Sequence, residues 1–295
     1  MILHSIDFAT RPLMEKLYHQ YGHGSSAMHF SSLYVWRNEM QLSVYLQPDL
    51  FAVKAGWRGQ NYWFFPCGKE QAKKEFLLSL AAHPSVFLCY ACEEDVAFAK
   101  QHLPGVYQFS HTPQDDEYLY ERSQQVELAG KKYRHQRNAL NRLNNNYSLG
   151  AQPLSDKTLG DAFTVLKAWS EKSHDMATGG LIGCNSVQEL LTDWKALDVC
   201  GVVVYEKDVP VALAAGYPLS SDCFDLSACI QSMENSDFSV FARHRLFQHL
   251  GDSFTVVNTE EDLGLAGLRT VKQGMHPCKI IQTYEGRIYD STFFR

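Results

Sequence analysis

The chain has 295 residues, with 27 Lys and Arg against 33 Asp and Glu and a formal net charge of -6. That length favours two domains or one large α/β unit, and the acidic balance argues against DNA binding, which needs an excess of cations over much of the surface. The longest apolar stretches are too short to span a bilayer and the start lacks a secretory pattern, so we expect a cytoplasmic protein without a transmembrane segment.

The eight cysteines are scattered along the chain. Cys89 and Cys92 form a close pair within an apolar strand-like run, but no second pair completes a zinc site. We therefore expect buried, reduced thiols and no metal. His23 and His135 stand without a partner at ligand or dyad spacing, so ordinary loop and surface roles are expected for them.

The first part of the chain alternates between strand and helix patterns. Apolar runs and helical spacings predict strands at 41–46, 50–55, 62–65, 86–91 and 106–110, and helices at 13–21, 69–82 and 93–103. Residues 30–36 fit either a helix or a strand. The polar, proline-containing segment 111–117 is the most plausible link, so we expect one lobe over residues 1–115 and a second over 116–295.

The second part begins with helices and continues as a β-meander. The expected helices are at 131–146, 156–173 and 187–197, followed by antiparallel strands at 201–206, 209–217 and 223–233. A helix at 238–250, a strand at 254–258, a helix at 263–274 and a strand at 279–284 complete the chain. The expected class is α/β with mixed sheets.

Two segments carry a family resemblance: YLYERSQQVELAGKKYRHQRNALNRL at 118–143 and VNTEEDLGLAGLRTVKQGMHP at 257–277. Both resemble the phosphatidylglycerol lysyltransferase C-terminal-domain family, which is related to the Fem-type aminoacyltransferases. The resemblance implies two GNAT-like acyltransferase lobes in tandem, with aminoacyl-tRNA as a donor and an anionic lipid as a candidate acceptor. The chain departs from the family pattern at Gln231 and Ser232, where a Glu-Lys pair is expected, and at Thr259, which replaces an Arg.

Glu260, Glu261 and Asp262 follow a predicted strand and precede a predicted helix, and they are the candidate catalytic residues. Acyl transfer to an amine needs a group that removes a proton from the nucleophile, and crowded carboxylates have raised pKa values that suit this task. The structural alternative is that Asp262 caps the helix while the two glutamates lie near its positive end.

Arg269 and Lys272 lie on that helix beside a predicted apolar stripe of Leu265, Leu268, Val271 and Met275. The two cations suit a carboxylate or phosphate ligand. An internal salt bridge to Glu260 or Glu261 explains them equally well.

The basic helix at 131–146 supplies the remaining substrate-binding candidates. Arg137 shares the apolar face of this helix, so it should meet a carboxylate or an anionic ligand. The candidates for binding tRNA phosphates, a nucleotide or anionic headgroups are Lys131, Lys132, Arg137, Asn138 and Arg142. A solvated charged face is the alternative.

The donor is constrained by a missing motif. GNAT enzymes that use acetyl-CoA resemble one another in a glycine-rich loop that binds pyrophosphate, whereas residues 233–240 here contain no glycine. Aminoacyl-tRNA therefore becomes the stronger candidate, with acyl-CoA as the other. Dinucleotide, NTP, α/β-hydrolase and zincin motifs are also absent.

These observations predict an acyl- or aminoacyltransferase that moves the group from a thioester or aminoacyl ester to an amine or hydroxyl acceptor in a cleft between the lobes. The alternative is a non-catalytic tandem GNAT-like protein that binds a ligand or a partner. A peripheral enzyme acting on membrane lipid is a third hypothesis, which lacks a strong polybasic run.

Overall fold

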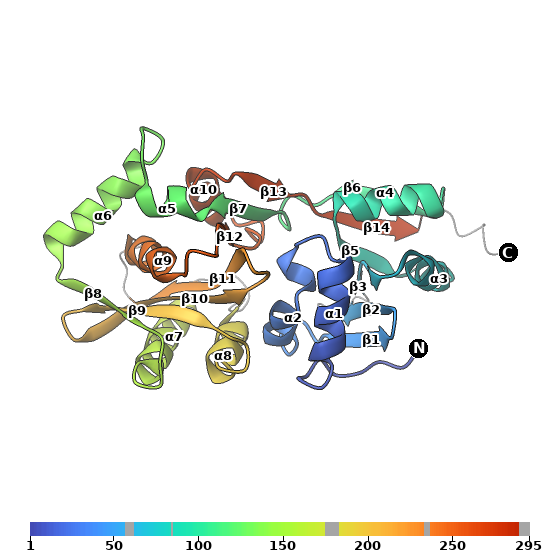
Figure 1. Ribbon diagram of the computed structural model, residues 1–295, viewed down its shortest axis with the longest axis horizontal. Helices are drawn as coiled ribbons and strands as arrows, with labels where there is room; N and C mark the ends of the chain where they lie inside the picture. The colour runs from blue at the N-terminus through green and yellow to red at the C-terminus, as the bar shows by residue number, and fades with distance from the viewer. Residues whose placement is uncertain (57–61, 84, 175–182, 233–236, 289–295) are drawn as a thin grey trace. The chain divides into compact units, whose positions relative to one another are not determined.

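The computed structural model describes residues 1–56, 62–83, 85–174, 183–232 and 237–288. The chain divides into two compact units, whose elements are labelled in Figure 1. The first unit contains residues 1–118, 260–269 and the segment from 280 onward, and the second contains 119–259 and 270–279. Within the described ranges, no helix is both long and apolar enough to cross a bilayer.

The first unit is built on a sheet with the strand order β1-β2-β3-β5-β14-β6, to which β4 adds beside β2. Its strands are β1 (Ser43–Gln47), β2 (Leu50–Ala55), β3 (Tyr62–Phe64), β4 (Cys67–Gly68), β5 (Phe87–Ala91), β6 (Tyr107–His111) and β14 (Tyr284–Ile288). The strand β14 comes from the C-terminal end of the chain and pairs antiparallel with both β5 and β6.

Helices with one apolar face cover this sheet, as their helical spacing predicts. They are α1 (Arg11–Tyr21), the short 3-10 helix η1 (Ser26–Met28), α2 (Phe30–Trp36), α3 (Glu70–Ala81) and α4 (Glu93–His102). The core between sheet and helices is rich in aromatic side chains: Trp63 and Tyr45 both pack on Phe76, with ring centroids 5.2 Å and 5.4 Å away. Residues 30–36 form a helix, which resolves the ambiguity of that segment.

The second unit contains a sheet with the order β13-β7-β12-β11-β10-β9-β8. Its strands are β7 (Glu117–Glu121), β8 (Leu149–Pro153), β9 (Cys200–Glu206), β10 (Val209–Pro218), β11 (Cys223–Gln231), β12 (Val256–Asn258) and β13 (Lys279–Ile281). Its helices are α5 (Arg122–Glu127), α6 (Arg134–Asn146), α7 (Leu159–His174), α8 (Cys184–Thr192), α9 (Asp237–His249) and α10 (Ala266–Gly274). The helices α7 and α9 pack on opposite faces of this sheet (Figure 1).

The meander β9-β10-β11 followed by α9, β12 and α10 is the element order of a GNAT-like core, as expected. The single boundary expected near residue 115 does not describe the chain fully, because residues 260–269 and the strand β14 belong to the first unit. Pairing partners of strands are set by long-range packing, and the sequence pattern of a short strand does not specify them.

A β-bulge in β11 lies at the centre of the second sheet. Ala215 pairs with Ala228 and Tyr217 with Asp225, so two residues of β11 face the single residue Gly216. A Cβ atom at Gly216 would lie 1.7 Å from the Asp225 carbonyl oxygen, so a side chain cannot be accommodated without moving the backbone. Bulges of this kind redirect a strand and are frequent next to functional sites.

Replacing Gly216 with alanine is therefore expected to destabilise the second unit by about 3 kcal/mol, since both atoms in the clash are held by the sheet. Gly267→Ala is the matched control, because a Cβ atom there meets no atom within 4 Å and alanine favours the helix. Urea denaturation of both variants measures the difference. Equal stability of the two variants would contradict the account of the bulge.

Candidate functional site

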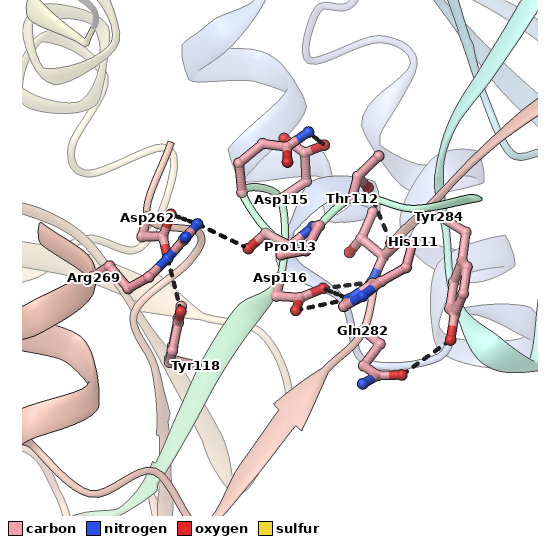
Figure 2. A network of polar contacts seen from close by, with 12 residues as sticks. His111, Thr112, Pro113, Asp115, Asp116, Tyr118, Asp262, Arg269, Gln282 and Tyr284 are labelled. Carbon is pink, nitrogen blue, oxygen red and sulfur yellow. Dashed lines mark hydrogen bonds and ion pairs between the residues drawn. The ribbon is translucent and has the colours of Figure 1, made fainter. Parts of the chain in front are cut away.

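The acidic segment Glu260–Asp262 forms a tight turn after β12. Glu260 and Leu263 have φ values of 59° and 55°, and Gly264 follows at 74°. The carboxylate of Asp262 is completely buried and accepts hydrogen bonds from the Tyr118 hydroxyl at 2.7 Å and the Gly264 N–H at 2.9 Å. Arg269 donates to both of its oxygens, from Nε at 2.6 Å and Nη2 at 2.9 Å (Figure 2). The turn is thus closed by a bidentate ion pair.

The sequence left two roles open for Arg269, binding of an anionic ligand and an internal salt bridge. An internal salt bridge is present, but its carboxylate belongs to Asp262 and not to Glu260 or Glu261. Burial by itself would raise the pKa of the Asp262 carboxyl, but the hydrogen bonds from Arg269, Tyr118 and the Gly264 N–H outweigh it and the pKa is lowered. A carboxylate with a lowered pKa and three donors is a poor proton acceptor near neutral pH.

The helix that follows has its faces reversed from the expectation. Leu265 and Val271 are 55% and 47% exposed, whereas Lys272 is buried and only Met275 of these apolar residues is deeply buried as expected. The predicted burial of Leu265 and Val271 is therefore wrong, whereas Leu268 is half-buried. The ion pair of Arg269 and the hydrogen bond of the Lys272 ammonium to the Thr259 carbonyl oxygen fix the orientation of the helix instead.

Further polar contacts tie the link after β6 to the segment before β14. His111 Nε2 lies 2.9 Å and 3.0 Å from the two carboxylate oxygens of Asp116, which also accepts from the Thr283 N–H at 2.9 Å (Figure 2). Thr112 donates its N–H to the Thr283 carbonyl oxygen at 2.9 Å. This network holds the returning C-terminal segment on the first unit.

Three acidic side chains lie around Tyr90 in the first unit. Burial is the main reason that the pKa of Tyr90 is raised well above its usual value, and the charges of Glu261 and Asp115 add to it. Burial also raises the pKa of Asp115 to about 6, with the nearby charges of Asp116 and Glu285 acting in the same direction. The pKa of Asp115 therefore lies closer to neutral pH than that of an ordinary aspartate. The sequence predicted a raised pKa for a carboxyl group of residues 260–262 instead.

The Asp115→Asn variant tests this titration through stability. Because the folded protein holds this proton more tightly than the unfolded chain, the contribution of Asp115 to stability falls as the pH rises from about 4 to about 6. The variant should therefore be more stable than the wild type at pH 7.5, by about 2 kcal/mol, and equally stable near pH 4. Thermal unfolding at both pH values measures this. A variant that is less stable than the wild type at pH 7.5 would show that the ionised Asp115 is stabilised in the fold.

The basic helix α6 uses part of its charge internally. Arg137 donates to the carbonyl oxygens of Leu128 and Gly130, the latter at 2.7 Å. The sequence predicted a carboxylate or an anionic ligand as its partner, and main-chain carbonyl groups take that place. Arg142 forms an ion pair with Asp237, the first residue of α9. Lys132 donates to the Gln124 side chain at 2.9 Å.

Other polar residues of this region face solvent. Lys131, Arg134 and Asn138 are exposed together with Lys132. Three of these four carry a positive charge, so the exposed surface around the start of α6 is suited to phosphate groups.

The strands β11 and β12 form the most distinctive feature of the second unit. They run parallel and pair over three positions, from Cys223–Val256 to Asp225–Asn258. The strand β12 then ends, while β11 continues to Gln231. The bulge next to Gly216 lies at the same point. We refer to this place, where β11 passes beyond the end of β12, as the strand split.

Buried polar side chains gather around the strand split. Asp225 and Asn258 are the last paired residues and both are completely inaccessible to solvent. Lys272 is buried too, and its ammonium donates to the carbonyl oxygen of Thr259, the residue after β12. A buried carboxyl group on the sheet and a buried ammonium on the adjoining helix α10 are costly to desolvate, and such groups are a frequent mark of function.

Arg243 of α9 adds a second buried cation. Its side chain is only 9% exposed, yet its guanidinium forms no hydrogen bond or ion pair with another residue of the described ranges. The charges of Arg243 and Lys272 both lower the pKa of the Cys229 thiol, although burial, the larger cause, leaves that pKa raised. Both cations thus lie near the segment of β11 beyond the split. An anionic or strongly polar group of a ligand would satisfy them.

The sequence missed most of this site. Lys272 was a candidate, but Asp225, Arg243 and Cys229 were not. The available signals were a single carboxylate inside the apolar strand CFDLSACI, a glycine inside the preceding apolar strand, and an arginine between Phe241 and Leu246 of a helix. The parallel neighbour of β11 comes from residues about 30 positions later in the chain, so sequence spacing alone could not bring these groups together.

The departures from the family pattern also have a structural place. Gln231 accepts the N–H of Ser239 at 2.9 Å through its side-chain oxygen, so it caps the first turn of α9. The carboxylate of Asp237 occupies the same turn. A hydrogen-bond acceptor and a carboxylate therefore already lie at the end of α9 where a pyrophosphate would bind. Residues 233–236 of the glycine-free segment lie outside the described residues.

Known proteins resemble this chain in sequence and in structure. The family model described as "Phosphatidylglycerol lysyltransferase, C-terminal" matches residues 18–285. A conserved protein of unknown function from Bacteroides thetaiotaomicron superposes with a TM-score of 0.88 at 20% identity, covering 98% of this chain and 100% of the other. No curated protein matches the sequence.

Two further solved structures carry informative descriptions. L-PGS from Bacillus licheniformis has a TM-score of 0.66 at 15% identity, covering 98% of this chain and 94% of the other. The C-terminal domain of a putative lysylphosphatidylglycerol synthetase from Agrobacterium fabrum has a TM-score of 0.67 at 12% identity, covering 97% and 92%. At these identities the similarity shows a shared fold.

Proposed function

The chain belongs to the phosphatidylglycerol lysyltransferase C-terminal family, and from that premise we propose that it transfers an aminoacyl or acyl group at the strand split of its second unit. The observation that carries this proposal is the pair of buried cations, Arg243 and Lys272, beside a strand whose parallel neighbour has ended. The two cations are placed to bind the carbonyl oxygen or an anionic part of the donor. Asp225 supplies a fully buried carboxyl group on β11 at this point.

The chemistry assigned to these groups is nucleophilic attack on an ester or thioester. The amine or hydroxyl of the acceptor bonds to the carbonyl carbon of the donor, and negative charge develops on the carbonyl oxygen. A buried ammonium or guanidinium stabilises this oxyanion more strongly than a solvated one would. The bond to the ribose oxygen or thiol then breaks, and the leaving group takes a proton.

Asp225 is proposed as the proton acceptor. Asp225 lies at the split itself, next to the bulge of β11. Glu261, which the sequence favours for this role, belongs to the first unit, where the charge that it places near Tyr90 is part of a crowded acidic group. Glu260 adjoins it, in a left-handed conformation. Asp262 is assigned a structural role, because Arg269 and Tyr118 occupy both of its oxygens.

We propose aminoacyl-tRNA as the donor. The first turn of α9 is capped by Gln231 and carries Asp237, which disfavours a CoA pyrophosphate at this helix. The exposed cations Lys131, Lys132 and Arg134 around the start of α6 suit the phosphates of an RNA end. The family name adds a lipid headgroup as the proposed acceptor, with a soluble amine as the alternative.

A donor panel tests the proposed function. Purified protein is incubated with aminoacyl-tRNAs and with acyl-CoAs, each in the presence of phosphatidylglycerol vesicles or a soluble amine, and the products are identified by mass spectrometry. We expect consumption of an aminoacyl-tRNA and an aminoacylated acceptor. If ligands raise the melting temperature but no donor is consumed, the chain is a binding protein and the transferase proposal fails.

A further inference from the structure

A second group of chemically reactive side chains lies in the first unit, separate from the strand split. His23 is in the loop after α1, Cys92 precedes α4, and Glu94 and Asp95 lie in the first turn of that helix. Cys92 is buried, whereas His23 and Glu94 are exposed. The fold thus brings a histidine from near the N-terminus to a cysteine and two carboxylates 69 or more positions later.

The distances within this group suit a shared metal ion. One ligand atom from each of His23, Cys92 and Glu94 lies within 4.8 Å of the others. Asp95 contacts two members of the group: its Oδ1 is 3.4 Å from His23 Nε2, and its Oδ2 accepts from Cys92 Sγ at 3.1 Å. Ligand atoms around a tetrahedral zinc ion are about 3.3–3.8 Å apart, given metal–ligand bonds of about 2.0–2.3 Å.

The charges of the group favour a divalent cation. As a thiolate, Cys92 adds one negative charge to those of Glu94 and Asp95, and His23 binds metals as the neutral imidazole. Lys73 is a cation near the group. Its Nζ lies 4.3 Å from the centre of the Phe98 ring, and its charge acts on the His23 imidazole. It offsets one of the three negative charges, and a divalent ion neutralises the remaining two.

We propose that His23, Cys92 and Glu94 form a zinc site in the first unit, with Asp95 holding His23 and Cys92 beside it. The mixed sulfur, nitrogen and oxygen ligands match the preferences of Zn²⁺ and disfavour Mg²⁺ and Ca²⁺, which take oxygen ligands. On binding, the Cys92 thiol releases its proton to solvent and the sulfur bonds to the metal. The ion then fixes the loop after α1 to the start of α4.

Cobalt(II) is the probe, because a thiolate ligand gives it a charge-transfer absorption band. The full chain, without a histidine tag and freed of metal with a chelator, is titrated with CoCl₂ and then with ZnCl₂. We expect a thiolate-to-cobalt band that saturates at one equivalent and disappears when zinc displaces cobalt. Zinc should also raise the melting temperature of the metal-free protein.

Four variants assign the band. Cys92→Ser should abolish it, while Cys89→Ser, which removes a thiol of β5 outside the group, should keep it. His23→Gln alters an exposed side chain that the fold tolerates and should prevent saturation at one equivalent, whereas His19→Gln should not. The proposal is overturned if the wild type shows no thiolate band, or if the band persists in Cys92→Ser. Neither result bears on the strand split, so this inference stands or falls independently of the transferase proposal.

Discussion

Lys272→Met is expected to lower kcat/KM for aminoacyl transfer by about 10²- to 10³-fold, the loss seen when one donor to a developing oxyanion is removed. Lys272 is buried beside the strand split, and its ammonium is held by the Thr259 carbonyl oxygen. Methionine keeps the length and the apolar stem of the side chain, so the change removes mainly the charge. The rate of product formation, followed by mass spectrometry, measures the loss.

Lys279→Met is the matched control, since Lys279 is an exposed lysine in the same unit. Its activity should stay within about twofold of the wild type, because an exposed charge in water stabilises a distant transition state very little. Thermal unfolding must accompany both assays, as Lys272→Met also leaves one carbonyl oxygen without its donor. Equal activity of the Lys272 and Lys279 variants would remove Lys272 from the site.

Asp262→Ala is expected to destabilise the first unit by about 2 kcal/mol, because buried donors lose their acceptor while the partly exposed Arg269 stays solvated. The change leaves the Arg269 guanidinium, the Tyr118 hydroxyl and the Gly264 N–H without their shared acceptor. Urea denaturation measures it. Asp49→Ala is the control, because its ion pair with Lys69 is about half exposed on both sides and should contribute less than about 1 kcal/mol.

The same ion pair predicts an acid dependence of stability. The pKa of Asp262 is lowered in the folded protein, so its contribution is complete above the pKa of the unfolded chain and is lost as the pH falls through the folded value. The stability difference between wild type and Asp262→Ala should therefore shrink in acid. A difference that is constant from neutral pH to strong acid would indicate that the loss comes from packing alone.

The sequence predicted most helices and strands because their patterns are local. The aromatic run of β3, the helical spacing of α3 and the turn residues of the β9-β10-β11 meander each suffice to identify an element. The strand β14 was not recognised, because its partners β5 and β6 lie more than 170 residues earlier in the chain. Nothing within residues 284–288 specifies that pairing.

The sequence predicted the candidate site in part. It identified Lys272 and the acidic turn, since cations and carboxylates at element ends are visible in the sequence. It did not assign Arg269 to Asp262, because it considered Glu260 and Glu261 as salt-bridge partners and gave Asp262 the role of a helix cap. It also predicted that Leu265 and Val271 are buried, because their helical spacing forms an apolar stripe. Both are exposed, since the polar contacts of Arg269 and Lys272 set the rotation of the helix.

The proposal that ligands bind at the strand split is tested most directly by Arg243→Met. Arg243 is 9% exposed and its guanidinium is unpartnered within the described ranges, so an apolar replacement should leave the stability unchanged or increase it. Titration calorimetry with an amide-linked aminoacyl-nucleoside, which cannot react, should show one site in the wild type and at least tenfold weaker binding in the variant. Unchanged affinity in a stable Arg243→Met protein would contradict a ligand site at the split.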